Sequence, residues 1–295
     1  MVSDVISFAS GRASEARVIQ EWTPSGLELL RCRPERATGA PVLFVHGAFS
    51  GAWCWAEHFL EAFAAAGHPA WAVSLRGHGA SAGRDRLAHH SLGDYVSDLR
   101  EAMQVIGEPV ALVGHSMGGF VIQKLLEGAG RDLGAIRGAA LVASVPPTGL
   151  ALPAAWMVMT RPDLYARLAL MVAGGPKLAA AMAGRALRRS LFATLPDDAQ
   201  VERYLALFHG ESSRVVLDMN GFDPLLPWCV SRSVPMLILG AEKDDLVPRP
   251  LVATTALIYQ RSFQMIPGLA HVVMLEAEWE RAAAPILTWL QTLKS

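Results

Sequence analysis

The sequence predicts an α/β fold in which a mostly parallel, doubly wound sheet carries an inserted cap of helices. From residue 42 onward, short apolar runs of β-forming residues alternate with longer stretches of helical periodicity. This pattern is typical of parallel strands covered by helices on both faces. The alternation stops between residues 146 and 228, where helical segments rich in Ala, Leu, Met and Arg follow one another. We therefore expect a core formed by residues 1–145 and 229–295, and a helical cap, or lid, formed by residues 146–228.

Each predicted strand is a short apolar run closed by glycine, proline or a small polar residue. The first forty residues predict two antiparallel strands, at 16–22 and 27–33, joined by the turn Thr23-Pro24-Ser25-Gly26. The later strands are predicted at 42–45, 70–73, 110–113, 139–143, 236–239 and 262–266, and the core helices at 53–66, 92–106, 118–127, 250–259 and 278–293. Loops beyond the carboxyl ends of such strands are where an open α/β sheet collects its functional residues.

The composition indicates a globular protein without a charge excess. Lys and Arg number 26 against 27 Asp and Glu, for a formal net charge of -1, so nucleic acid is not expected as a partner. Hydrophobic residues make up 52% of the chain, which excludes disorder. Cys32, Cys54 and Cys229 form no CxxC pair, so neither a zinc site nor a disulfide framework is expected.

Two features bear on location. Residues 1–22 carry charges and lack the continuous apolar stretch of a secretory signal, so we expect a cytoplasmic protein. Residues 138–160 carry no charge, but Pro146, Pro147 and Pro153 divide them, which favours a buried strand and a loop over stable membrane insertion.

The peptide Gly114-His115-Ser116-Met117-Gly118 fits the pattern G-x-S-x-G between a predicted strand and a predicted helix. In that setting the glycines permit a sharp turn that holds a serine hydroxyl clear of the sheet. The alternative is a glycine-rich turn with an exposed serine. We predict that Ser116 is a nucleophile.

A serine hydroxyl needs a histidine base and an acid that orients it. The strand at 236–239 runs into an acidic loop that contains Glu242, Asp244 and Asp245 before Pro248, and His271 follows the next strand. The chain order Ser, acid, His is therefore present.

Two further peptides complete a set of motifs by which the chain resembles the α/β-hydrolase superfamily over nearly its whole length. Phe44-Val45-His46-Gly47-Ala48 is similar to the family's oxyanion-loop motif, and residues 76–81 resemble the loop after the family's fourth strand. Ser74 departs from the pattern, because many members have Asp there, and we expect this to alter a structural hydrogen bond without touching catalysis.

The resemblance implies roles for individual residues. It assigns Ser116 as nucleophile, His271 as base and Asp244 as acid, the latter because the family's acid usually lies four residues before the proline; Asp245 and Glu242 remain alternatives. It also implies an oxyanion hole formed by the backbone N–H groups of Met117 and Ala48, with Phe49 as the alternative to Ala48.

The predicted function is hydrolysis of a neutral or hydrophobic carboxylic ester, a thioester or a lactone included, through an acyl-enzyme and without metal or cofactor. The alternatives are a cofactor-free perhydrolase or another non-hydrolytic enzyme of this fold, and an inactive ligand-binding protein. The expected partner is a small-molecule ester. For substrate binding we select Phe49, Trp156, Met159, Phe208 and Val272.

Other histidines are expected to have lesser roles. His78, His89 and His90 lack carboxylates at ligand spacing, so solvated or loop-packing roles are favoured over a metal cluster. His209 is the rival to His271 as base, but it lacks a position at a strand end.

Overall fold

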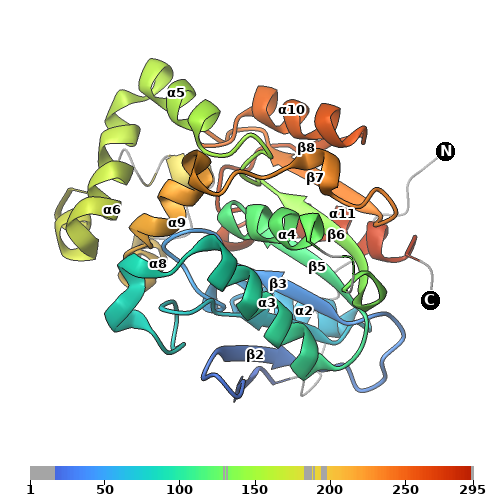
Figure 1. Cartoon of the computed structure of the whole chain (residues 1–295). Coiled ribbons are helices and arrows are strands. Elements are labelled where there is room, and N and C mark those ends of the chain that lie inside the picture. The colour runs from blue at the N-terminus through green and yellow to red at the C-terminus, as the bar shows by residue number, and fades with distance from the viewer. Residues whose placement is uncertain are drawn as a thin grey trace.

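The computed structural model describes residues 17–128, 130, 132–182, 188, 190–193 and 198–293. These residues form a sheet of eight strands in the order β1-β2-β4-β3-β5-β6-β7-β8 (Figure 1). The strands are β1 (Ile19–Trp22), β2 (Glu28–Cys32), β3 (Val42–Val45), β4 (Ala70–Val73), β5 (Val110–His115), β6 (Ile136–Val142), β7 (Met236–Ala241) and β8 (Gln264–Ile266). The mostly parallel α/β sheet predicted from the sequence is confirmed.

The pairing of the strands determines where the loops meet. β1 pairs with β2, and β2 with β4, in antiparallel register. All pairs from β4 through β3, β5, β6 and β7 to β8 are parallel. The carboxyl ends of these six strands therefore lie along one edge of the sheet, as parallel strands require.

Helices cover both faces of the sheet. Those of the core are α1 (Trp53–Ala56), α2 (Phe59–Ala65), α3 (Leu92–Ile106), α4 (Met117–Glu127), α10 (Arg249–Tyr259) and α11 (Glu280–Leu290). Buried residues of α3, α4 and α10 share one apolar cluster with the sheet, and those of α1, α2 and α11 share the other. Along β3 the side chains alternate between the two clusters, Leu43 and Val45 in the first and Val42 and Phe44 in the second, which is the period of a strand.

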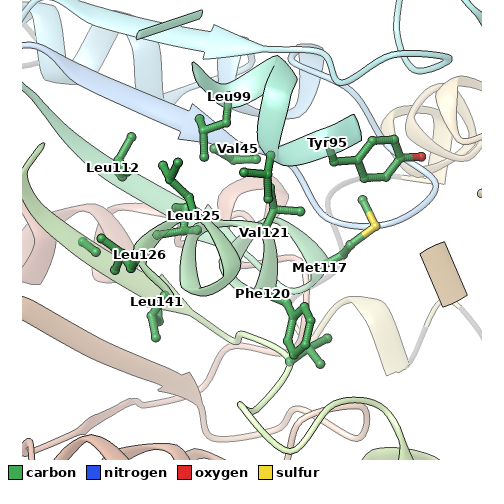
Figure 2. Packing of buried hydrophobic residues seen from close by; sticks show 14 of the residues in the cluster. Val45, Tyr95, Leu99, Leu112, Met117, Phe120, Val121, Leu125, Leu126 and Leu141 are labelled. Carbon is green, nitrogen blue, oxygen red and sulfur yellow. The ribbon is translucent and has the colours of Figure 1, made fainter. Parts of the chain in front are cut away.

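The first cluster fixes the helix that follows β5. Figure 2 shows Val121 and Leu125 of α4 packed among Leu99 of α3, Val45 of β3 and Leu112 of β5. Because these side chains are buried, α4 cannot shift without opening the core. Helix α4 is thus held firmly against the sheet.

Between β6 and β7 the described residues include the helices α5 (Ala151–Thr160), α6 (Pro162–Met182), α8 (Asp198–Leu207) and α9 (Ser213–Leu217). Figure 1 shows them gathered at one end of the sheet. A π-helical turn follows at Asp218–Phe222, and short 3₁₀ turns lie at Arg84–His89, Leu133–Ala135, Pro227–Cys229 and Val273–Leu275. The division of the chain into core and cap stays a prediction.

Several predicted elements have other bounds in the structure, and residues 151–160 of the stretch expected to be a strand and a loop form helix α5. The helix predicted at 53–66 is two helices, α1 and α2, because His58 has φ -142° and ψ -43° between them. β6 begins at Ile136, three residues before the predicted strand. Residue 16, at the start of the first predicted strand, and most of the segment tested for a secretory signal lie outside the described residues. Within the described chain, no helix combines the length and apolarity needed to cross a membrane.

Candidate active site

Ser116 occupies a sharp turn between β5 and α4. Its backbone has φ 51° and ψ -116°, a conformation that a residue with a side chain rarely adopts. The turn is possible because its neighbours are glycines: a Cβ on Gly118 would lie 2.4 Å from the carbonyl oxygen of His46, and one on Gly114 2.6 Å from that of Gly118. The sequence therefore places the serine hydroxyl at the carboxyl end of the central strand.

Three side chains from separate strand ends form one series of hydrogen bonds. His271 Nε2 lies 3.1 Å from Ser116 Oγ, and His271 Nδ1 lies 2.8 Å from Asp244 Oδ2. With Asp244 ionised, Nδ1 carries the hydrogen and donates it, which leaves Nε2 to accept from the serine hydroxyl. The structure thus brings together the three residues that the sequence selected.

Asp244 is fully buried and held on both oxygens. Its Oδ1 accepts the backbone N–H groups of Leu246 at 2.8 Å and Val247 at 2.9 Å. Burial acts to raise the pKa of this carboxyl group, but the charge and hydrogen bond of His271 and the two backbone donors outweigh it, so the pKa lies below its usual value. Asp244 is therefore an ionised group beside the imidazole.

The two alternative acids point elsewhere. Asp245 pairs with Arg161, at the junction of α5 and α6, and accepts a hydrogen bond from Ser190. Glu242 accepts the backbone N–H of Gly268 at 2.8 Å. Of these three carboxylates, Asp244 is the one hydrogen-bonded to His271.

The loop after β3 lies beside Ser116. His46 Nε2 accepts the backbone N–H of Leu75 at 3.0 Å, so its Nδ1 carries the hydrogen and donates to the carbonyl oxygen of Gly47 at 2.8 Å. That carbonyl shares a planar peptide group with the N–H of Ala48, so the histidine orients both. Burial, followed by the charge of His78, lowers the pKa of His46 to about 3, consistent with this neutral form.

The neighbouring N–H groups differ in their availability. Phe49 already donates its N–H to Glu211 Oε2 at 3.3 Å. Met117 is the first residue of α4, and the first N–H groups of a helix have no acceptor within it. Ala48 and Met117 both line the cavity described next.

A cavity of about 880 Å³ lies over Ser116 and His271. Most of its lining is apolar and comes from both the core loops and the helices between β6 and β7; the contributing residues include Val145, Leu150, Met157, Leu168, Met171, Leu205, Met219, Leu246 and Met274. Phe49, Phe208 and Val272, selected from the sequence for substrate binding, are among its lining residues.

Trp156 and Met159, which were also selected, are not brought to the cavity. Both are exposed, Met159 by 83%, whereas Pro153 and Met157 on the same helix are buried and line the cavity. Residues four apart share one face of a helix, and 156 and 159 fall on the other. These two assignments are corrected: the residues that α5 presents to the cavity are Pro153, Ala154 and Met157.

Of the other histidines, His78 and His209 have structural partners. His78 is fully buried and lies 3.0 Å from Glu211 Oε2, and His209 Nε2 accepts the backbone N–H of Gly79. Burial lowers the pKa of His209 to about 4, with the charge of His78 acting in the same direction. His89 is exposed, and no group of three or more His, Cys, Asp or Glu within the described chain is arranged to hold a metal ion.

Glu211 and Glu28 were missed by the sequence reading. Glu28 is buried and accepts the Ser74 hydroxyl at 2.7 Å, and Ser74 in turn accepts the N–H of Ala52. A carboxylate from β2 is thus hydrogen-bonded to the serine found where many family members have Asp. Glu211 follows His209 in an irregular segment, where no local pattern marks it.

Comparisons with known proteins concern the family and the fold. The family model described as "Alpha/beta hydrolase family" matches residues 42–284. Methyl jasmonate esterase 1 of Vitis vinifera is 41% identical over 90 residues, which are 29% of this chain and 33% of the relative. Norfluorocurarine synthase 2 of a Strychnos species is 43% identical over 83 residues, 27% of this chain and 30% of the relative. The matched regions therefore span about a third of the length of these curated relatives.

The whole fold also has counterparts among solved structures. A thermophilic esterase from Thermogutta terrifontis, determined with malate bound, superposes with a TM-score of 0.65 at 20% identity, covering 95% of this chain and 100% of that one. At this level of identity the likeness concerns the fold.

Proposed function

Because the chain belongs to the alpha/beta hydrolase family, we propose that it is a serine esterase that cleaves a neutral or hydrophobic carboxylic ester through an acyl-enzyme. The observation that carries this proposal is the hydrogen-bonded series Ser116, His271 and Asp244 at the floor of an apolar cavity. Nucleophile, base and acid are thereby in the arrangement that acyl transfer requires.

In the proposed reaction, His271 Nε2 takes the proton of Ser116 as Oγ attacks the ester carbonyl. Asp244 keeps the hydrogen on Nδ1 and stabilises the imidazolium that forms. His271 then gives its proton to the alcohol oxygen as the ester bond breaks. Water, activated by the same imidazole, attacks the acyl-serine and releases the carboxylic acid, which restores Ser116.

The oxyanion that forms during attack would be bound by the backbone N–H groups of Ala48 and Met117. Ala48 is favoured over Phe49 because the Phe49 N–H is already committed to Glu211. The peptide that contains the Ala48 N–H is oriented in advance by His46. Such preorganised donors are worth most in a cavity that excludes water.

The cavity supports an apolar substrate. Its volume of about 880 Å³ lies toward the upper end of the range for small-molecule sites, and aliphatic side chains form most of the walls. A relative named methyl jasmonate esterase is in keeping with an uncharged ester. Helices α5 and α6 would then act as the roof that selects among acyl groups, which is the role expected of the cap at residues 146–228.

Ser116→Ala tests the proposal directly. The variant is expected to lose turnover of p-nitrophenyl esters down to a residual roughly a thousandfold above the water reaction, because oxyanion donors and binding remain. It is also expected to lose covalent labelling by a fluorophosphonate, which the native protein should show. Near-native turnover by the folded variant, checked by circular dichroism, would contradict the proposal that the protein is a serine esterase.

A further inference from the structure

The segment between α8 and α9 is hydrogen-bonded to Phe49, which follows the oxyanion loop after β3. Phe49 donates its N–H to Glu211 Oε2 at 3.3 Å, and its carbonyl oxygen accepts the backbone N–H of His209 at 2.9 Å. Both peptide groups of Phe49 are thus bound by residues that lie more than a hundred positions later in the sequence. The next residue toward the amino terminus is Ala48, the proposed oxyanion donor.

Phe49 needs such restraint. It has φ 67°, in the left-handed region that a bulky side chain disfavours. Its side chain also lines the cavity. Without external hydrogen bonds, the loop would gain by rotating Phe49 out of this region, and the Ala48–Phe49 peptide would rotate with it.

Glu211 is built to supply that restraint. It is 4% exposed, and its two oxygens accept from four donors. Oε1 accepts from the Tyr95 hydroxyl at 2.8 Å and the Ser212 N–H at 2.7 Å, while Oε2 faces His78 Nε2 at 3.0 Å and the Phe49 N–H. Burial acts to raise its pKa, but His78 and the other donors outweigh burial and lower it to about 2, so it is ionised at neutral pH.

The carboxylate is itself anchored to the core. Tyr95 lies on α3 with its ring in the apolar cluster shown in Figure 2, and the Ser212 hydroxyl donates to the carbonyl oxygen of His90 at 2.6 Å. The core therefore fixes the position of Glu211, and Glu211 in turn fixes the Phe49 N–H.

We propose that Glu211 is a positioning residue that holds the oxyanion loop in its working conformation. It fixes the Ala48–Phe49 peptide through the Phe49 N–H, and so holds Ala48 where its own N–H, in the peptide that His46 orients, points at the reacting oxygen. This inference rests on the proposed esterase function. It gives the segment between α8 and α9 a role in transition-state stabilisation, in addition to any role in binding.

Glu211→Gln is the discriminating variant. Gln offers one carbonyl oxygen and one NH₂ group, so the four donors to Glu211 cannot all find acceptors. The hydrogen bonds on one of the two oxygens are therefore lost. We expect kcat for p-nitrophenyl acetate to fall about 10- to 100-fold with KM within about threefold, since loss of a whole oxyanion donor costs about 10²–10³. A trifluoromethyl ketone, which forms a tetrahedral oxyanion on serine, should bind more weakly by the same factor.

Two further variants separate positioning from general damage. Asp223→Asn, further along the chain, removes a carboxylate charge that pairs with Lys124 and should keep kcat within about threefold. Phe49→Gly allows a positive φ without strain, so Glu211→Gln should cost less kcat in that background than in the native one. A merely structural role for Glu211 would produce no such rescue. If Glu211→Gln does not yield folded protein, Glu211→Asp takes its place, since it keeps the charge but shortens the side chain. It is expected to show the same fall in kcat with KM within about threefold.

The outcomes distinguish the two proposals. A folded Glu211 variant with native kcat and native ketone affinity overturns the positioning role while leaving the esterase intact. A native protein that neither cleaves esters nor reacts with a fluorophosphonate overturns the esterase itself.

Discussion

Replacing Asp244 by Asn should disable the base by changing which nitrogen of His271 carries the hydrogen. An amide can present its oxygen either to the two backbone donors of Leu246 and Val247 or to His271. Turning the NH₂ group toward the backbone would leave both N–H groups without an acceptor, which costs about 1–3 kcal/mol for the buried one of Val247. The oxygen therefore stays with the backbone, and the NH₂ group donates to His271 Nδ1.

His271 must then carry its hydrogen on Nε2, where it cannot accept the proton of Ser116. We expect turnover of p-nitrophenyl acetate to fall by at least about a thousandfold, which corresponds to about 4 kcal/mol of activation free energy. The measurement is kcat at neutral pH, with the melting temperature as the check that the fold is kept.

Asp245→Asn is the matched control, one residue away. Asp245 pairs with Arg161 and Ser190 and makes no hydrogen bond to His271 within the described residues. Its replacement should cost less than about tenfold in kcat. The opposite ranking of the two variants, or near-native turnover by Asp244→Asn, would refute the assignment of the acid and the tautomer argument with it.

Two other outcomes follow from the cavity and from the buried histidines. Met157→Ala should lower kcat/KM for long-chain p-nitrophenyl esters about fivefold, since removing roughly 40 Å² of apolar contact at 25 cal/mol per Å² costs about 1 kcal/mol; Met159→Ala, on the exposed face, should change it less than twofold, and equal losses would contradict the placement of α5. The free energy of unfolding should fall as the pH is lowered from about 6.5 toward 4. Burial is the main cause that lowers the pKa of His46 and His115 to about 3 and that of His209 to about 4. In this pH range the unfolded chain therefore binds protons on these histidines that the folded chain does not bind. Urea unfolding at pH 8, 6 and 4 measures this, and a flat profile would count against it.

The central strands were accessible from the sequence because their burial is nearly complete. The runs at 42–45 and 70–73 coincide with β3 and β4, in which every residue is buried. The helix break at His58 was not accessible, because Trp55, Phe59 and Phe63 all face the same core on either side of it. The spacing of apolar residues indicates which face of a helix is buried, but it does not indicate the irregular backbone angles of His58 between two short helices.

The candidate site divides in the same way. Ser116 and His271 follow strands in short peptides whose residue types are set by local geometry, so a linear reading can find them. α5 is different: it has no charged residue, and an apolar helix gives no sign of which face meets a cavity. Glu211 lies furthest from prediction, since its partners Phe49, His78 and Tyr95 come from distant loops and helices and are assembled by tertiary structure.

The unusual backbone of Ser116 matters for anyone who wishes to capture a substrate complex. A residue with a side chain held at φ 51° and ψ -116° stores on the order of 1–3 kcal/mol. Ala at this position keeps the stored strain and so preserves the shape of the turn, whereas Gly would release it and let the turn relax. Gly would thus give an inert protein that is more heat-resistant than the native one, and laboratory evolution for thermostability alone would reward loss of the nucleophile. Ala is the better choice for trapping an intact ester in the cavity.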